Sequence, residues 1–425
     1  MLARHILAAA IAFGFLTSLL TTGGRYVHSL EAERIHALAP KLFDLKNQGS
    51  ELQSAAFRQP DLLVVYGSSE LEGPNPYHAS AVFQTYPTGF TIFPVGRGET
   101  TSLVMLQDLA AVGSELRGKK VAISVSPPWF FLHDRPPNFY APNFSLLHLS
   151  ALVFSTDLSY QTKQLAIRQL LQSPSLFSGD PLVAFASQRL AEDGPIGRLA
   201  YLACLPLGKL HNALLSLQDM WATVSYLSSQ PVVDQPPRAA VDIDWAQLTR
   251  QARLEQQSAS SNNDLGFDNT IWSTKYARLV EQRVGQFTDA WFTDNLQHTA
   301  EFSDLDILLR GLRELGAEPL LLSQPIAGKY YDRIGISAAA RSEYYAHLRQ
   351  VASLHDVPVV DFEDHDNDIY FVTDPNSHLS REGWVYYDRA LDAFDQGTLA
   401  ELARADFRAG AVLPADRAGA AAPLQ

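Results

Sequence analysis

The chain has 425 residues, of which 46% are hydrophobic and 19% are charged; this composition supports a sizeable core and excludes a largely disordered chain. Its formal net charge of −13 argues against nucleic acid as a partner, because binding to phosphates requires clustered Lys and Arg. The one cysteine, Cys204, excludes an intrachain disulfide and a cysteine-rich metal site.

The amino terminus carries an apolar stretch long enough to cross a membrane. Residues 6–24 are uncharged and would span about 28 Å as a helix, close to the thickness of a bilayer core. A cleaved signal peptide is the alternative, but its apolar region is usually shorter, and TTGGRYVHS offers no small-x-small cleavage site. We therefore expect a retained single-pass transmembrane helix at 6–24.

Short apolar runs that alternate with amphipathic helical patterns predict an α/β fold. The runs lie at 61–69, 121–131, 318–328 and 357–364, and helical patterns precede the last three of them at 101–116, 302–316 and 341–355. This alternation is typical of a parallel sheet with helices on both faces.

The stretch 145–300 interrupts this alternation. It is mostly helical in character, and we interpret it as a large helical insertion between the second and third apolar runs. The domain that contains it is expected to cover residues 40–400. Residues 405–425 are rich in Ala, Gly and Pro and are expected to form a flexible tail.

The first apolar run ends in a glycine followed by two serines, Gly67-Ser68-Ser69. Ligands of an open parallel sheet bind at the carboxyl ends of the strands. A serine on a tight strand-to-helix turn can act as a nucleophile, while N–H groups at the start of the helix stabilise an oxyanion. The alternative for these serines is an ordinary helix N-cap.

A serine nucleophile needs a base, and His378 is the candidate. It lies four residues after Asp374 and two residues before Ser380, where an amphipathic helical pattern begins. Asp374 can hold one tautomer of the imidazole and stabilise its charged form. Taken alone, this stretch is better explained by a surface histidine beside a capped helix, and it becomes informative only together with the paired serines.

Taken together, these stretches resemble the SGNH/GDSL hydrolase fold, whose first motif is Gly-x-Ser after the first strand. More narrowly, they resemble the DltD family of membrane-anchored D-alanyl transfer proteins. The resemblance covers residues 6–395 and is carried, in family order, by the apolar amino terminus, GSSEL, SPPWF, SNNDLGFDN at 261–269, QPIAGKYYDRIG at 324–335 and DPNSHLSREGW at 374–384.

The resemblance implies roles for individual residues. Ser69, at the third position of Gly-x-Ser, is expected to be the nucleophile, and His378 the general base. Asp374 matches the acidic partner, but the family commonly has Asp-x-x-His, whereas this chain has one residue more between the two. If Asp374 does not orient the imidazole, Asp361, Asp364 or a backbone carbonyl would take its place.

The donors of the oxyanion site are less directly indicated. In SPPWF, Pro128 stands where the family frequently has glutamine, and proline has neither a side-chain amide nor a backbone N–H. The backbone N–H of Ser69 is one candidate donor and Gly98 is another, although a simple turn also explains this glycine. Ser68 is assigned to the same binding region and is the alternative nucleophile.

The resemblance implies a serine acyltransferase that moves D-alanyl groups onto a hydroxylated envelope polymer, such as teichoic acid or a lipopolysaccharide-type glycan. Its implied partners are a membrane-bound O-acyltransferase, a D-alanyl carrier system, the polymer and the cell membrane, with the catalytic domain on the extracytoplasmic side. No metal or organic cofactor is expected, because serine ester chemistry needs none. The alternatives are an envelope esterase of the same fold and a non-catalytic scaffold subunit of a membrane acyl-transfer complex.

Overall fold

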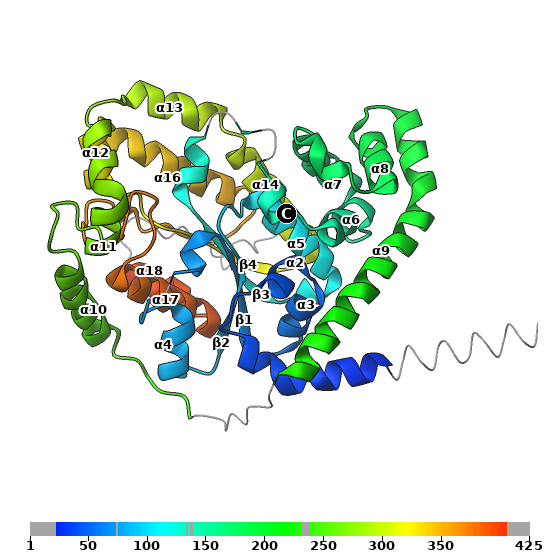
Figure 1. The fold of residues 1–425 in the computed structure, drawn as a ribbon, viewed down its shortest axis with the longest axis horizontal. Coiled ribbons are helices and arrows are strands. Elements are labelled where there is room, and N and C mark those ends of the chain that lie inside the picture. Colours follow the sequence, from blue (N-terminus) through cyan, green and yellow to red (C-terminus); the bar gives the residue numbers. More distant parts are fainter. Residues whose placement is uncertain (1–22, 74, 133–134, 137–138, 231–238, 406–425) are drawn as a thin grey trace, which may run out of the picture.

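The computed structural model describes residues 23–73, 75–132, 135–136, 139–230 and 239–405 (Figure 1). The expected anchor at 6–24 lies outside these residues except for its last two, and the expected tail at 405–425 lies outside them except for residue 405. Within the described ranges, no helix combines the length and the apolar character needed to cross a membrane.

Five parallel strands form one sheet at the centre of the molecule. They are β1 (Leu62–Gly67), β2 (Thr91–Gly96), β3 (Lys120–Val125), β4 (Glu318–Ser323) and β5 (Val359–Val360), in the order β2-β1-β3-β4-β5. Every residue of β1 is buried, as expected for a strand that is covered on both faces. The predicted α/β class with a parallel sheet is confirmed.

Helices cover both faces of this sheet. On one face lie α3 (Glu51–Arg58), α5 (Ser102–Val112) and α14 (Glu301–Leu315), and on the other lie α4 (Ala79–Thr85) and α17 (Arg381–Gln396) (Figure 1). In α5, every residue except Ala111 is buried, because α14 and the later helix α6 (Leu146–Phe154) pack against it from outside the sheet. A helix that is apolar nearly all round is therefore explained by its central place in the core.

Four further helices before β2 and after β4 are short or begin at a capping serine. They are α2 (Asp44–Gln48), α15 (Gly328–Ile334), α16 (Ala338–Ser353) and α18 (Leu399–Ala405). The Ser337 side chain accepts the N–H of Ala340 at the start of α16, and Ser380 accepts the N–H of Gly383 at the start of α17. The cap at Ser380 determines where the chain leaves the loop that carries His378 and enters α17.

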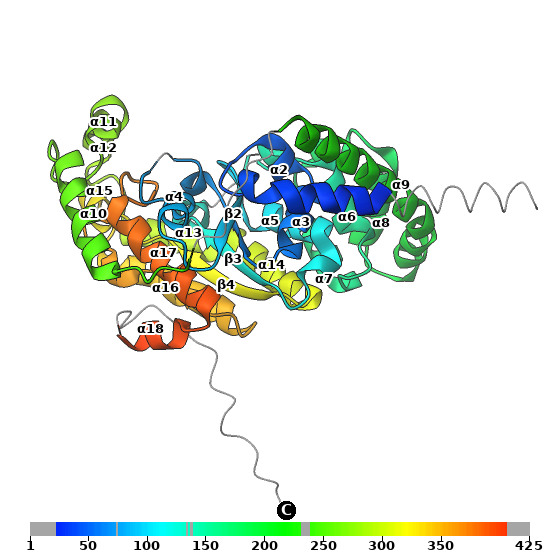
Figure 2. The same ribbon diagram turned by 90° about the horizontal axis from the view of Figure 1, so that it is seen from below.

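The chain between β3 and β4 forms two groups of helices on opposite sides of the molecule (Figures 1 and 2). The first group packs beside α5 and consists of α6 (Leu146–Phe154), α7 (Tyr160–Leu170), α8 (Pro181–Ala191) and α9 (Pro195–Ser229). The second lies beside α15, α16 and α17 and consists of α10 (Trp245–Ala259), α11 (Asn269–Ile271), α12 (Ala277–Arg283) and α13 (Asp289–His298). The stretch 145–300 thus contacts the sheet domain from two sides.

Two glycines allow the carboxyl ends of β1 and β2 to approach each other closely. Gly67 pairs with Gly96, which has a φ of 136°, and a Cβ at Gly96 would lie 2.0 Å from the carbonyl oxygen of Gly67. The loop after β2, which contains Gly98, is thereby held beside the turn that follows β1.

Candidate active site

The turn after β1 presents Ser69 and buries Ser68. Ser69 begins a short 3₁₀ helix, Ser69–Leu71, directly after the strand. Ser68 is 1% exposed, and its Oγ has no hydrogen-bond partner among the described residues, whereas Ser69 is only half-buried. Of the two serines, Ser69 is therefore the one that a substrate can reach.

His378 connects Ser69 with Asp374. Its Nε2 lies 2.8 Å from Ser69 Oγ, and its Nδ1 lies 2.6 Å from Asp374 Oδ2. The His378 side chain is 30% exposed and that of Asp374 is 5% exposed, so the carboxylate is shielded while the imidazole remains accessible. A histidine held in this way can take a proton from a serine while its other nitrogen stays bound to the carboxylate.

The extra residue between Asp374 and His378 is accommodated in a closed loop. An antiparallel bridge between Val372 and Leu379 joins the two ends of this loop. Ser377 has a φ of 65°, in the left-handed region that non-glycine residues rarely adopt. The left-handed turn at Ser377 brings the chain back toward Asp374, so the longer spacing still allows the 2.6 Å contact.

Asp374 uses both of its oxygens. While Oδ2 contacts His378, Oδ1 accepts the backbone N–H of Asn376 at 2.8 Å. The Asn376 side chain in turn donates to the Tyr276 hydroxyl at 2.8 Å. Tyr276 ends the π-helical segment Trp272–Tyr276, a geometry that is rare in general and recurrent at functional sites. The sequence did not indicate this support, because the two residues lie 100 positions apart.

The alternative partners of His378 are engaged elsewhere. Arg349 donates to both oxygens of Asp361, at 2.7 Å from Nε and 3.0 Å from Nη2. Burial raises the pKa of Asp361 to about 6, although its bonds to Arg349 act in the opposite direction. The nearest nitrogen recorded for Asp364 belongs to His365, at 3.9 Å. Among the described residues, Asp374 is therefore the carboxylate that holds His378.

The surroundings of His378 raise its pKa above the usual range. Burial by itself lowers this pKa, because a charged imidazolium loses hydration, but the hydrogen bond and the charge of Asp374 outweigh that effect. The charge of Glu70 adds to the rise, and Lys275 opposes it. His378 consequently becomes a neutral base only at a higher pH than a free histidine does.

Glu70 holds the turn that carries the serines. Its Oε1 accepts the backbone N–H of Ser68 at 2.8 Å, and its Oε2 accepts the hydroxyl of Ser126 at 2.9 Å. Ser126 follows β3, so the buried Glu70 ties the end of β1 to the end of the neighbouring strand. The sequence contained one signal for this role, an acidic residue immediately after the paired serines.

The loop after β2 supplies a second side of the site. A Cβ on Gly98 would lie 3.8 Å from Ser69 Cβ, so Gly98 faces the serine. Asn143 holds this loop, since its Nδ2 donates to the Gly98 carbonyl at 3.1 Å and its Oδ1 accepts from Arg97 Nε at 2.7 Å. The Ser69 N–H is at the first position of a helix and has no helical partner. Pro128 offers no backbone N–H, as expected from the sequence.

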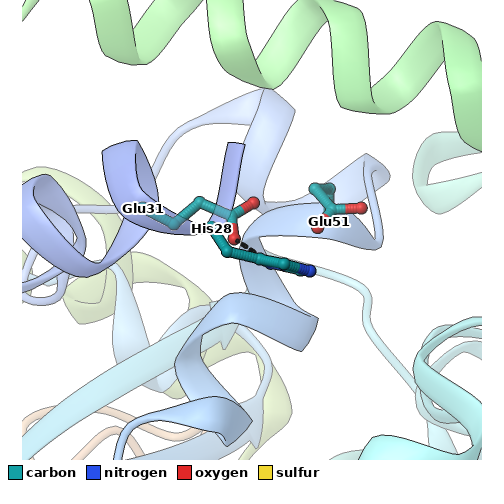
Figure 3. Close-up of side chains that lie close together, drawn as sticks. All are labelled: His28, Glu31 and Glu51. Atoms are coloured by element: carbon teal, nitrogen blue, oxygen red, sulfur yellow. Dashed lines mark hydrogen bonds and ion pairs between the residues drawn. The ribbon is translucent and has the colours of Figure 1, made fainter. Parts of the chain in front are cut away.

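One other cluster of described residues has the spacing of metal ligands. His28, Glu31 and Glu51 place ligand atoms within 4.8 Å of one another, on the helix at 23–38 and on α3 (Figure 3). Arg58 Nη2, however, donates to Glu31 and to Glu51, in each case at 2.8 Å. Because this guanidinium already binds both carboxylates, we assign the cluster to the attachment of the amino-terminal helix to α3.

Comparisons with known proteins match almost the whole described domain. A family model described as DltD protein matches residues 39–396, a range that includes Ser69, Asp374 and His378. A relative named Protein DltD from Bacillus subtilis (strain 168) is 28% identical over 366 residues, which cover 85% of this chain and 88% of the relative. Protein DltD from Staphylococcus aureus (strain NCTC 8325 / PS 47) is 23% identical over 378 residues, which cover 89% of this chain and 92% of that protein.

Proposed function

Because the chain belongs to the DltD family, we propose that it is a serine acyltransferase that transfers D-alanyl groups onto a hydroxyl-bearing polymer of the cell envelope. The observation that carries the proposal is the hydrogen-bonded series from Ser69 through His378 to Asp374, with distances of 2.8 and 2.6 Å. Such a series activates a serine hydroxyl for attack on a carbonyl carbon. Family membership supports the D-alanyl group as the unit transferred.

The first step forms an ester on Ser69. As Ser69 Oγ attacks the carbonyl carbon of a D-alanyl ester or thioester, its proton passes to His378 Nε2, and Asp374 stabilises the resulting imidazolium. The N–H groups of Ser69 and Gly98 are the proposed donors to the oxyanion. When the tetrahedral intermediate collapses, the bond to the leaving alcohol or thiol breaks, and the leaving group takes the proton from His378.

The second step releases the D-alanyl group to the acceptor. A polymer hydroxyl loses its proton to His378 Nε2 and attacks the carbonyl carbon of the Ser69 ester. The new polymer ester forms as the bond to Ser69 Oγ breaks, and the proton returns from His378 to Ser69. Neither step needs a metal ion or an organic cofactor.

The setting of this reaction is part of the proposal. We place the catalytic domain on the extracytoplasmic side of the cell membrane, anchored by residues 6–24, with a membrane-bound O-acyltransferase and a D-alanyl carrier system as partners. A teichoic acid or a lipopolysaccharide-type glycan is the acceptor. Intact-mass measurement of membrane-purified protein tests the anchor, and a mass that begins after residue 24 would contradict it.

Hydrolysis is the second candidate function. His378 is 30% exposed, so water can reach the same nitrogen that would activate a polymer hydroxyl. An esterase would form the same Ser69 ester but pass the D-alanyl group to water. Purified protein charged with a D-alanyl thioester distinguishes the two functions, because a transferase yields more polymer ester as acceptor is added, whereas an esterase yields free D-alanine regardless.

A serine-reactive fluorophosphonate probe tests the mechanism, with Ser68→Ala as the matched control for Ser69→Ala. We expect the probe to label Ser69 and Ser69→Ala to reduce both labelling and envelope D-alanyl ester formation by about 10⁴-fold or more. Ser68→Ala should retain both. The reverse pattern would identify Ser68 as the nucleophile, and ester formation in both variants would favour a scaffold that positions other components.

A further inference from the structure

Helix α9 exposes an apolar face along most of its length. Leu199, Leu207, Leu210, Leu214, Leu217 and Trp221 are between 43% and 75% exposed. At about 100° per residue these side chains fall within an arc of about 80°, and they extend over about 33 Å of the helix axis. We call these six residues the leucine face. A continuous apolar surface of this size marks an interaction site in most soluble domains.

The opposite face of α9, which packs on the protein, is the more polar one. Its buried residues are Gly197, Tyr201, Gly208, Asp219, Thr223 and Leu227. A Cβ on Gly208 would lie 2.1 Å from Phe154 of α6, so the helix is in close contact there. Asp219 accepts the backbone N–H groups of Ser50 and Glu51, at 2.7 and 2.8 Å. Amphipathic helices of globular domains normally bury most of their leucines, whereas α9 buries Leu227 and exposes the five leucines of the leucine face.

The charges on α9 favour an anionic surface as the partner. Although the whole chain carries a net charge of −13, the charged residues exposed on α9 are Arg198 and Lys209, and its one acidic residue, Asp219, is buried. Helices that lie in the surface of an anionic bilayer combine a Leu- and Trp-rich face with Lys and Arg on their polar side. A protein partner would not require that acidic residues be absent from the exposed part of the helix.

The amino-terminal segment lies next to one end of α9. The helix at 23–38 runs beside the carboxyl end of α9 in both views (Figures 1 and 2), and Arg34 Nη1 donates to the carbonyls of Leu227 and Gln230, at 2.8 Å for Gln230. The uncharged stretch 6–24 leads directly into this helix. A bilayer that contains this stretch would therefore meet the molecule close to α9.

We propose that α9 lies along the surface of an anionic lipid bilayer, with the leucine face at the boundary between headgroups and acyl chains. The contact adds to the amino-terminal anchor and limits how the domain can tilt about it. It rests on the amino-terminal anchor proposed above but not on the chemistry proposed for Ser69, so this contact and that chemistry can each fail without the other.

A fluorescent probe on the leucine face tests this contact in the full-length protein. Cys204→Ala removes the native thiol, and Leu214→Cys provides one position for an environment-sensitive label. The protein is reconstituted into vesicles of phosphatidylcholine and phosphatidylglycerol, with or without nitroxide-bearing lipid. We expect a blue-shifted emission and at least about twofold quenching by the nitroxide lipid, because the label lies among the acyl chains.

Leu354→Cys in the same background is the matched control. Leu354 is 63% exposed, compared with 53% for Leu214, and it follows α16, which lies far from α9 in both views (Figures 1 and 2). Its label should remain solvent-like and unquenched. A solvent-like label at position 214 would overturn the proposal. A blue-shifted label that nitroxide lipid does not quench would also overturn it, because a second copy of the chain would then cover the face.

Discussion

His378 Nε2 lies 2.8 Å from Ser69 Oγ, although 309 positions separate the two residues in the chain. Ser69 follows β1, and His378 lies in the loop between β5 and α17. Because all the strands of the sheet are parallel, their carboxyl ends meet at the same edge. The topology of the sheet therefore determines that the first and last polar loops of the domain come together.

Asp374→Asn should lower the rate of probe labelling at Ser69 by about 10⁴-fold, because an amide would stabilise the wrong tautomer of His378. Asp364→Asn is the matched control, since Asp364 lies in a neighbouring loop and does not contact His378. Its labelling rate should equal that of the wild type. Equal rates for Asp374→Asn and the wild type would remove Asp374 from the mechanism.

The labelling rate should rise with pH through the raised pKa of His378. Only the neutral imidazole can accept the Ser69 proton, so the protein is inactive below that pKa and active above it. Because Asp374 is the main cause of the rise, Asp374→Asn should move the midpoint to lower pH, despite its lower maximal rate. Rates measured across the pH range test this, and a midpoint that moves to higher pH would contradict the assignment.

Glu70→Ala should lower the labelling rate by about 10²-fold. The variant would lose the two hydrogen bonds that the Glu70 carboxylate accepts from Ser68 and Ser126, and these bonds hold the turn that carries Ser69. Glu70→Gln keeps an acceptor for the Ser68 N–H and can donate to Ser126, so it should recover most of the rate. It should also lower the pH midpoint, since the charge of Glu70 contributes to the raised pKa of His378. A Gln variant as slow as the Ala variant would argue against positioning through these bonds.

Arg135→Met should destabilise the fold by about 3–5 kcal/mol at neutral pH or above, because it leaves two buried carboxylates without their cation. Arg135 lies 2.9 Å from Glu301 and 2.5 Å from Asp304. Arg168→Met is the control, since the pair of Arg168 with Asp193 is exposed and should contribute at most about 1 kcal/mol. Urea denaturation of both variants gives the comparison.

The cost of Arg135→Met should also depend on pH. Burial raises the pKa of Glu301 to about 7 and that of Asp304 to about 6, so both carboxyls protonate more readily in the folded state than in the unfolded state. A carboxyl group whose pKa is raised in the folded state contributes to the free energy of unfolding at low pH. This contribution is lost as the pH rises through the pKa of the group in the folded state. The difference in free energy of unfolding between the wild type and Arg135→Met should therefore be small near pH 4 and grow through about pH 6 to 7. A deficit that is constant with pH would mean that lost packing, and not unpaired charge, is its cause.

Much of the fold class and the candidate residues could be predicted from local patterns. Buried strands of a parallel sheet are continuous apolar runs, so β1 and β3 were visible without any knowledge of their neighbours. The motifs around Ser69 and His378 were recognisable for the same reason, because each is confined to a few consecutive residues. The uncharged stretch at 6–24 is likewise a property of the sequence itself.

The tertiary structure decided what depends on residues far apart in the chain. Ser69 rather than Ser68 contacts His378, because Glu70 and Ser126 hold the turn in one conformation. The left-handed Ser377 compensates for the unusual spacing of Asp374 and His378, and no propensity predicts a serine there. The sequence also left open which face of α9 is exposed. The helical period of its side chains shows only that the helix has an apolar and a polar face. Its contacts with α6 and with the chain before α3 determine that the leucine face is the exposed one.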